Sequence, residues 1–342
     1  MLDDLKYIHD RDSVDTLGIA EKQWQQLSYQ FQTGQAEIDV DNIVYAGMGG
    51  SALAALISQS WPGYNKPFEI VRNYDLPDYV SARTFFIACS YSGNTEETLS
   101  ALIQAERKGA HIAVIAGGGK LFDIAKEKGY TLALLPKAEQ PRYAVLYNLK
   151  ALVVLLSDAQ LVNPQIVQEL EVAAPFLQSS VANWLPTIRT SNNFAKQLAL
   201  ECIGKSVVIY AGPNLYPAAY KWKISFNENA KQVAWVGQYP EFKHNEFIGW
   251  SKQPIDKPYA IIELKSRFEH ERIQKSFIIV ERLLSGLWPH PNAINVEGAS
   301  LLEQLLWVIT IGDFVTLYTA LLNGLNPAPV ELVEKLKQEM SQ

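Results

Sequence analysis

Apolar runs of strand length recur along this chain, and each is followed by a glycine or polar turn and then by a helical pattern. This alternation is typical of βαβ units and predicts a parallel sheet covered by helices. In the first half we expect strands at Asn42–Ala46, Phe68–Arg72, Thr84–Cys89, His111–Ile115 and Leu132–Leu134, and helices at Ala52–Ser60, Thr95–Lys108 and Leu121–Lys128. Together they predict one complete doubly wound domain.

The second half repeats the alternation after a continuously helical stretch, Tyr147–Leu185. Its expected strands are Lys205–Ala211, Tyr259–Leu264, Ser276–Val280 and Ala293–Val296, and its expected helices begin near Pro217 and cover Ser266–Glu271, Ser300–Asn323 and Val330–Met340. We therefore predict an α/β fold of two doubly wound parallel-sheet subdomains flanked by helices. The expected division is 1–155, a helical connector at 156–190, and 191–342.

Composition narrows the classes of function. The 342 residues are 48% hydrophobic and 19% charged, as in a soluble globular protein, and the formal net charge of −6 argues against a nucleic-acid partner. Only two cysteines occur, Cys89 and Cys202, and both lie in apolar runs, so a disulfide framework is excluded. With no basic leader and no run of 18 apolar residues, we expect a cytoplasmic protein with no membrane partner.

A glycine-rich loop, Gly47-Met48-Gly49-Gly50-Ser51-Ala52, follows the first strand and opens a helix. Glycines let the backbone approach a phosphate, and the N–H groups of the helix N-terminus face it. The loop also satisfies a variant dinucleotide fingerprint, but that fold needs an acidic residue at the end of the second strand. Here the second strand ends at Arg72, which weakens the case for NAD and leaves NADP open.

A second loop, Ser90-Tyr91-Ser92-Gly93-Asn94-Thr95, follows the third strand and opens another helix. Its three hydroxyls can each donate to a different phosphoryl oxygen, while the helix end adds N–H donors and positive dipole. The alternative is an ordinary helix cap built on Thr95. Capping needs one such residue, so the cluster favours a monophosphate site.

The two loops together resemble the SIS (sugar isomerase) family: G-x-G-G-S after the first strand and S-Y-S-G-N-T after the third. The resemblance implies a phosphosugar-binding domain. The residues that it implies around the phosphate are Gly49, Gly50, Ser51, Ser90, Ser92 and Thr95.

The second half supplies candidates for acid–base chemistry, Asn227-Glu228-Asn229 and His244-Asn245-Glu246. Aldose–ketose isomerisation needs a base that carries a proton between adjacent carbons and a group that opens the sugar ring, and glutamate and histidine can fill these roles. Glu228 and His244 could each equally be an ordinary solvated side chain. No second histidine stands at metal spacing, so we expect no metal site.

Nearly the whole chain resembles the bifunctional phosphoglucose/phosphomannose isomerases. The matching segments are Arg72-Asn73-Tyr74, Leu76-Pro77, Pro141-Arg142, Tyr220-Lys221-Trp222-Lys223, Asn227 to Lys231, Pro240-Glu241, His244-Asn245-Glu246, Asn326-Pro327 and Leu336-Lys337. The resemblance implies two SIS subdomains per chain and a homodimer with its active site at the subunit interface. It also implies interconversion of glucose 6-phosphate or mannose 6-phosphate with fructose 6-phosphate, without a cofactor.

The resemblance also assigns roles. Glu228 would be the proton-shuttling base through a cis-enediol, and His244 of the partner subunit would assist ring opening. Arg142 would stabilise the enediolate oxygens through its fixed charge. Lys337, or Lys335 in its place, would reach the sugar. Ala328 departs from the family, which usually has Asp-Pro-Thr-Pro where this chain has Asn326-Pro327-Ala328-Pro329, and leaves the choice of hexose phosphate open.

Two other classes of function remain at this stage. SIS domains also serve as non-catalytic phosphosugar sensors in regulators, although this chain shows no basic helix-turn-helix. An NADP-dependent oxidoreductase could be built on the glycine loop alone.

Overall fold

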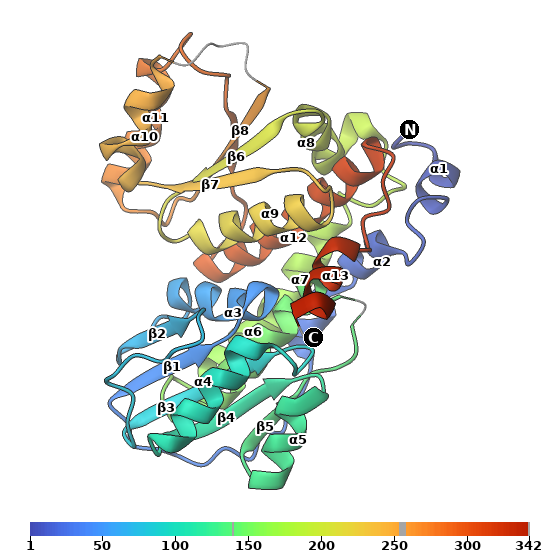
Figure 1. Ribbon diagram of the computed structural model, residues 1–342. Helices are drawn as coiled ribbons and strands as arrows, with labels where there is room; N and C mark the ends of the chain where they lie inside the picture. Colours follow the sequence, from blue (N-terminus) through green and yellow to red (C-terminus); the bar gives the residue numbers. More distant parts are fainter. Residues whose placement is uncertain (139, 253–257, 341–342) are drawn as a thin grey trace. The chain divides into compact units, whose positions relative to one another are not determined.

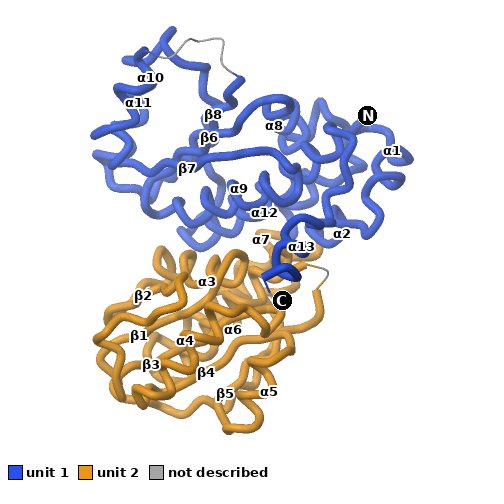
Figure 2. The backbone as a smooth tube through the Cα atoms, in the orientation of Figure 1, with its two compact units in different colours: residues 1–21, 178–342 blue, residues 22–177 orange. Residues whose placement is uncertain are grey.

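The computed structural model describes residues 1–138, 140–252 and 258–340, and the chain divides into two compact units (Figure 2). Unit 2 is Lys22–Leu177, and unit 1 combines Met1–Glu21 with Gln178–Gln342. The N-terminal segment, with α1 (Leu5–His9) and α2 (Thr16–Glu21), therefore belongs with the C-terminal half rather than with the first domain as expected. The Tyr7 hydroxyl, for example, donates to the carbonyl oxygen of Leu321 at 2.7 Å.

Unit 2 contains a five-stranded parallel sheet in the order β2-β1-β3-β4-β5 (Figure 1). Its strands are β1 (Asn42–Ala46), β2 (Phe68–Val71), β3 (Thr84–Ser90), β4 (His111–Ala116) and β5 (Thr131–Leu134). Its helices are η1 (Gln23–Ser28), α3 (Gly49–Ser60), α4 (Glu96–Arg107), α5 (Gly119–Lys128), η2 (Pro141–Tyr143), α6 (Val145–Asp158) and α7 (Gln165–Val181), the last of which runs into unit 1. The doubly wound domain is confirmed.

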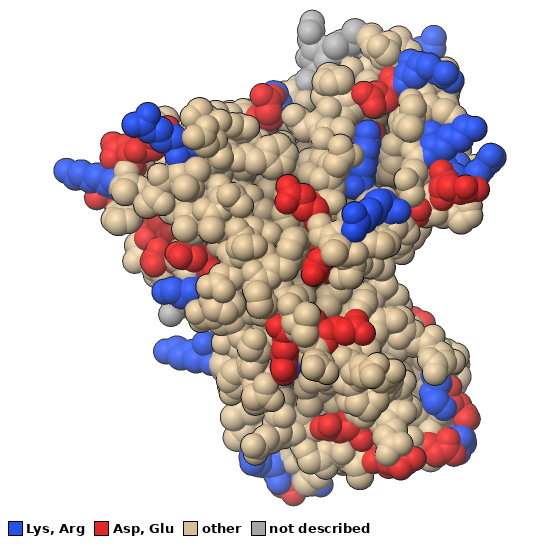
Figure 3. All heavy atoms as spheres, turned by 180° about the vertical axis from the view of Figure 1, so that it is seen from behind, with Lys and Arg blue, Asp and Glu red and all other residues tan. Residues whose placement is uncertain are grey.

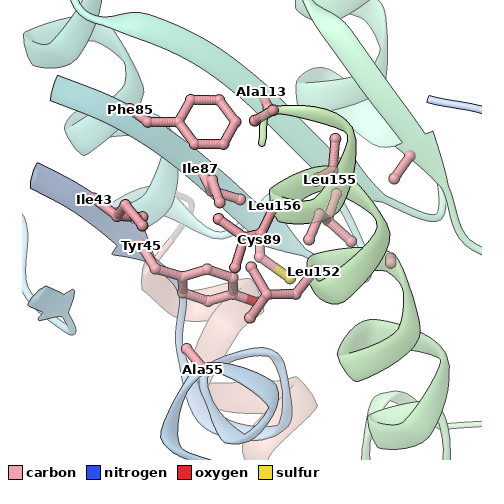
Figure 4. Close-up of a cluster of buried hydrophobic side chains, with 14 of the residues drawn as sticks. Ile43, Tyr45, Ala55, Phe85, Ile87, Cys89, Ala113, Leu152, Leu155 and Leu156 are labelled. Atoms are coloured by element: carbon pink, nitrogen blue, oxygen red, sulfur yellow. The ribbon is translucent and has the colours of Figure 1, made fainter. Parts of the chain in front are cut away.

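Alternate residues of these strands build a core on each face of the sheet, as the period of two requires. Ile43 and Tyr45 of β1, with their neighbours on β3, pack on one face against Ala55 of α3 and Leu152 of α6 (Figure 4). The intervening residues pack on the other face against α4 and α5, through Ala101, Leu102, Ala105, Leu121 and Ala125. Helices α3 and α4 thus lie on opposite faces of the sheet.

Unit 1 contains a four-stranded parallel sheet in the order β7-β6-β8-β9. Its strands are β6 (Ser206–Ala211), β7 (Ala234–Gln238), β8 (Tyr259–Lys265) and β9 (Asn292–Asn295). Besides α1 and α2, its helices are η3 (Thr190–Asn192), α8 (Phe194–Cys202), α9 (Tyr216–Glu228), η4 (Glu241–His244), α10 (Glu246–Trp250), α11 (Glu271–Leu283), α12 (Leu301–Leu322) and α13 (Glu331–Met340). Counted in chain order, its strands follow the same 2-1-3-4 pattern as the first four strands of unit 2.

Two of the elements expected in this half are wrong. Ser276–Val280 is not a strand but part of α11, where Phe277, Val280 and Leu284 are buried at helical spacing and Ile278 is 68% exposed. Ser266–Glu271 is not a helix: residues 266–270 form the turn that precedes α11, and Glu271 is the first residue of that helix. The edge strand β7 was not expected from the sequence, and the two helices α6 and α7 were expected as one continuous helical stretch.

Helix α12 is long and apolar enough to cross a membrane. Its most apolar 18-residue stretch has a mean hydropathy of 1.8, but 94% of that stretch is buried inside the protein. It contacts α2, α8 and α9, beside which it lies in Figure 1, so it is the core helix of unit 1. A Cβ at Gly312 would overlap the indole of Trp222, whose Nε1 donates to the carbonyl oxygen of Val308 at 2.7 Å. The glycine thus allows α9 and α12 to approach closely.

Charged side chains on the surface are mixed in sign. On the face shown in Figure 3, Lys and Arg are interspersed with Asp and Glu, and no broad basic area extends over either unit. Exposed ion pairs such as Arg83 with Asp41, at 2.7 Å, contribute to this mixing. This face offers no surface for a polyanion.

In unit 1 the ion pair of Lys221 and Asp313 is fully buried. The Lys221 ammonium of α9 donates to the Asp313 carboxylate of α12, and the Ser225 hydroxyl lies 3.1 Å from the same oxygen. Both charged side chains are 1% exposed, so each depends on the other to offset its lost hydration.

We predict that Lys221→Met lowers the free energy of unfolding by about 3–5 kcal/mol, because Asp313 is left as a buried charge without its ammonium. Urea denaturation measures the change. The double variant Lys221→Met/Asp313→Leu should recover most of the loss, and Lys275→Met, which removes an exposed lysine, should change stability by no more than about 0.5 kcal/mol. Equal stability of Lys221→Met and the parent would contradict the role of the pair.

Candidate active site

The two serine-bearing loops meet at the carboxyl edge of the sheet in unit 2. Strands β1 and β3 are neighbours and parallel, so the loops that follow Ala46 and Ser90 lie side by side. The hydroxyl of Ser51 accepts the backbone N–H of Tyr91 at 3.2 Å and joins the two loops directly. This is the topological switch point, where ligands bind in open α/β sheets.

The glycine loop turns sharply into α3. Gly49 has φ +50°, a left-handed conformation that favours glycine, and a Cβ at Gly47 would lie 3.0 Å from the carbonyl oxygen of Cys89. Met48, the N-cap residue, makes no side-chain capping hydrogen bond. The first turn of α3 therefore offers its N–H groups at this edge without a side-chain cap.

Within the serine loop, Ser90 and Ser92 have different environments. The Ser90 hydroxyl is buried, accepts the N–H of Gly93 at 3.1 Å and lies 2.8 Å from the hydroxyl of Thr95. Ser92 is exposed and Thr95 half-buried. Thr95 is the N-cap residue of α4, yet its side chain makes no capping hydrogen bond, so the alternative of a simple helix cap is not what the structure shows.

A third loop, Gly117-Gly118-Gly119, braces the serine loop and was missed in the sequence analysis. Gly93 has φ +69°, and a Cβ there would overlap the carbonyl oxygen of Gly118. The side chain of Asn94 accepts the N–H of Lys120 at 3.1 Å. Three consecutive glycines directly after a strand were the available signal.

Arg142 is also brought to the glycine loop. It lies in η2 and is 2% exposed, and a Cβ at Gly50 would lie 3.5 Å from its Cα. Gln26 fixes this segment, because its Nε2 donates to the carbonyl oxygen of Tyr143 at 2.7 Å. The segment that carries the permanent positive charge of Arg142 thus lies beside the N-terminus of α3.

These features suit a phosphate monoester: two helix N-termini without side-chain caps and several hydroxyls lie at one edge, with the backbone of Arg142 close to Gly50. The strand order 2-1-3-4-5 is the flavodoxin-like one, whereas the dinucleotide-binding fold has the order 3-2-1-4-5-6. The fold thus favours a monophosphate site over an NADP site.

Glu228 lies in unit 1 as the last residue of α9, where it is half-buried. The turn after it is firmly held. Asn229 is fully buried and donates from Nδ2 to the hydroxyl of Thr316 at 3.0 Å. The ammonium of Lys231 donates to the carbonyl oxygens of Asn326 at 2.9 Å and of Pro327 at 3.0 Å. The end of α9 and the Asn326–Pro327 segment therefore form one rigid corner.

His244 lies at the other edge of the same sheet. Because α9 connects the carboxyl end of β6 to the amino end of the parallel β7, Glu228 is at the amino edge. His244 follows the carboxyl end of β7 and ends η4, which Phe242 anchors in an aromatic core. The five residues of β7 separate the two edges by about 17 Å. One unit therefore does not bring Glu228 and His244 together.

Lys337 lies in α13, which follows the Asn326–Pro327 segment, and its side chain is exposed. Lys335, the alternative, lies 3.9 Å from Glu339 on the same helix. Among residues 1–138, 140–252 and 258–340, no group of three or more His, Cys, Asp or Glu side chains could hold a metal ion.

We predict different effects for the two loop serines. Ser92→Ala should weaken binding of fructose 6-phosphate without loss of stability, because Ser92 is exposed. Ser90→Ala should weaken binding and also lower the free energy of unfolding by about 0.5–1.5 kcal/mol, since it removes a buried hydroxyl that accepts the Gly93 N–H and lies 2.8 Å from the Thr95 hydroxyl. Titration calorimetry and urea denaturation separate the two. Full binding by Ser92→Ala would remove Ser92 from the site.

Two family models match the chain. The model described as "SIS domain" matches residues 38–157, and the one described as "Bacterial phospho-glucose isomerase C-terminal SIS domain" matches residues 191–340. Their positions agree with the sheets of unit 2 and unit 1.

Similar proteins support the same assignment. The bifunctional phosphoglucose/phosphomannose isomerase of Aquifex aeolicus is 31% identical over 87% of this chain and 90% of its own length. The D-glucosamine-6-phosphate 4-epimerase of Sulfolobus acidocaldarius is 34% identical over 77% of this chain and 84% of its own length. A glucose-6-phosphate isomerase-like protein of Thermus thermophilus shares the fold, with a TM-score of 0.68, 17% identity and 98% of each chain covered. The chain therefore belongs to the family of the bifunctional phosphoglucose/phosphomannose isomerases, which is a family of SIS-domain proteins.

Proposed function

We propose that this protein is a sugar-phosphate isomerase that interconverts glucose 6-phosphate or mannose 6-phosphate with fructose 6-phosphate through a cis-enediol, without a cofactor. Relatives bearing the isomerase name support the reaction. The observation that carries the substrate class is the hydrogen-bonded pair of loops joined by Ser51 and Tyr91, with Arg142 beside them. The sensor alternative has no comparable support.

The proposed mechanism gives each candidate residue a separate role. The loops of unit 2 hold the phosphate through Gly49, Gly50, Ser51, Ser90, Ser92 and Thr95. Glu228 takes the proton from C2 of the open-chain aldose and returns it to C1, and Arg142 stabilises the oxygens that gain negative charge in the enediolate. His244 assists ring opening, and Lys337 contacts the sugar.

The homodimer belongs to the same proposal. Glu228 and His244 lie at opposite edges of one sheet, so a site that contains both requires His244 of the partner subunit. Ile248, four residues after His244, is 68% exposed, and Trp235 on the edge strand β7 is 58% exposed. Large exposed apolar side chains on the same unit as His244 suit a subunit interface.

We expect Glu228→Gln to lower turnover by about 10²–10⁴-fold while leaving the affinity for fructose 6-phosphate unchanged, because the amide keeps the size of the side chain but cannot take a proton. Incubation with fructose 6-phosphate in deuterated water provides the readout. The parent should form an aldose 6-phosphate with deuterium at C2, detected by NMR. Glu127→Gln, which alters an exposed glutamate of α5, is the matched control and should behave as the parent.

Near-normal turnover by Glu228→Gln would remove Glu228 from the mechanism. If the parent binds fructose 6-phosphate but forms no aldose and exchanges no deuterium, the isomerase proposal is wrong. Because one relative is an epimerase of glucosamine 6-phosphate, that sugar should be tested in parallel. Epimerisation of it without conversion of fructose 6-phosphate would replace the proposed reaction.

Mixing two inactive variants tests the shared site. In a twofold dimer, chains carrying Glu228→Gln and chains carrying His244→Ala form mixed dimers in which one of the two sites has both native residues. Equal mixing after denaturation and refolding should restore about a quarter of the parent activity, because about half of the dimers are mixed and each has one intact site.

If both residues of a site came from one chain, no mixed dimer would have an intact site and activity would stay at the level of the single variants. That outcome would contradict the contribution of His244 by the partner subunit. Refolding each variant alone is the control for recovery of the protein.

A further inference from the structure

The switch point of unit 1 has the same topology as the phosphate loops of unit 2. Strands β6 and β8 are parallel neighbours, as β1 and β3 are, and β7 lies on the other side of β6. Gly212 follows β6 and leads into α9, just as Gly47 follows β1 and leads into α3. By the general rule for open α/β sheets, this edge is a second place where an anion would bind.

The carboxylate of Glu269 already fills this place. Glu269 follows β8, is 5% exposed, and accepts the backbone N–H of Asn214 at 2.9 Å and of Leu215 at 3.3 Å through one oxygen. These N–H groups stand at the N-terminus of α9, whose N-cap residue is Leu215. A Cβ at Gly212 would overlap the Glu269 side chain, so the glycine makes room for the carboxylate as it would for a phosphate.

The loop after β8 is built around this arrangement. The Asn214 amide donates to the carbonyl oxygen of Phe268 at 3.0 Å, and Gln274 donates to the carbonyl oxygen of Glu269 at 2.8 Å. Ser266, the first residue after β8, donates its hydroxyl to the side chain of Gln304 at 2.5 Å. Burial raises the pKa of the Glu269 carboxyl, while the two N–H donors favour its ionised form.

We propose that the edge between β6 and β8 is a second oxyanion site whose resident ligand is the Glu269 carboxylate, so that each chain takes one phosphate, through unit 2. In unit 2 the loop after β3 supplies hydroxyls that can donate to a phosphate. In unit 1 the corresponding loop supplies a negative charge that occupies the donors and repels a second anion. The proposal rests on the proposed function only for the phosphate bound by unit 2, and its test does not measure isomerisation.

Removal of the side chain should open the site. In a Ser51→Ala/Ser92→Ala background, which weakens the site of unit 2, we expect Glu269→Ala to gain an inorganic phosphate site. Phosphate at about five times its Kd should then raise the Tm by about 1–2 °C over chloride of equal ionic strength. Glu269→Gln is the matched control. Its amide oxygen can still accept both N–H groups and fill the site, so phosphate should have no added effect.

Titration calorimetry with fructose 6-phosphate gives a second readout, with one site per chain expected for the parent. The proposal is wrong if the parent binds two, or if phosphate affects Glu269→Ala no more than Glu269→Gln. If Glu269→Ala does not fold in chloride, recovery on refolding with phosphate is measured instead, together with Glu269→Ser. Failure of phosphate to restore either variant would equally overturn the proposal, whereas loss of isomerase activity would not bear on it.

Discussion

The structure depends on two helices that follow neighbouring strands at the centre of a parallel sheet and pack on its opposite faces. Because β1 and β3 are neighbours while α3 and α4 pack on opposite faces, neither helix covers the edge between them. The N-termini of both helices therefore meet there without side-chain caps. Hydroxyls add donors at a position whose backbone suits an anion, and the backbone of the buried Arg142 lies close to Gly50 there.

Unit 1 has the same arrangement of parallel strands, but a side chain of the protein itself occupies the corresponding edge. In unit 1 the edge between β6 and β8 holds Glu269. This contact fixes the N-terminus of α9, and Asn229 and Lys231 fix the turn at its other end. Helix α9 is thus tied at both ends. One copy of the topology can bind a ligand, while the other uses its donors to hold the helix that carries the candidate base.

Much of the fold could be predicted from local patterns, because strands buried on both faces are continuous apolar runs and phosphate loops have glycines and serines at fixed places. The errors have physical causes. The run Ser276–Val280 is rich in β-branched residues, yet it is helical because only one side of it is buried. Strand β7 contains a glycine and the exposed Trp235, so its sequence lacks the continuous apolar run by which the other strands were recognised. The contact of residues 1–21 with the C-terminal half is long-range, and so is the contact of Glu269 with Gly212, and no local pattern records either.

The proposed catalytic residues raise a problem that local motion cannot solve. Glu228 is held by a corner in which Lys231 binds two carbonyl oxygens of the Asn326–Pro327 segment. His244 follows Phe242, which is fully buried among aromatic rings at the other edge of the sheet. A rearrangement that joined the two within a unit would have to break one of these packed regions and expose its apolar surface. Association of two chains leaves both packed regions intact. A shared site therefore requires less free energy than an internal rearrangement to bring a base and an acid to one sugar.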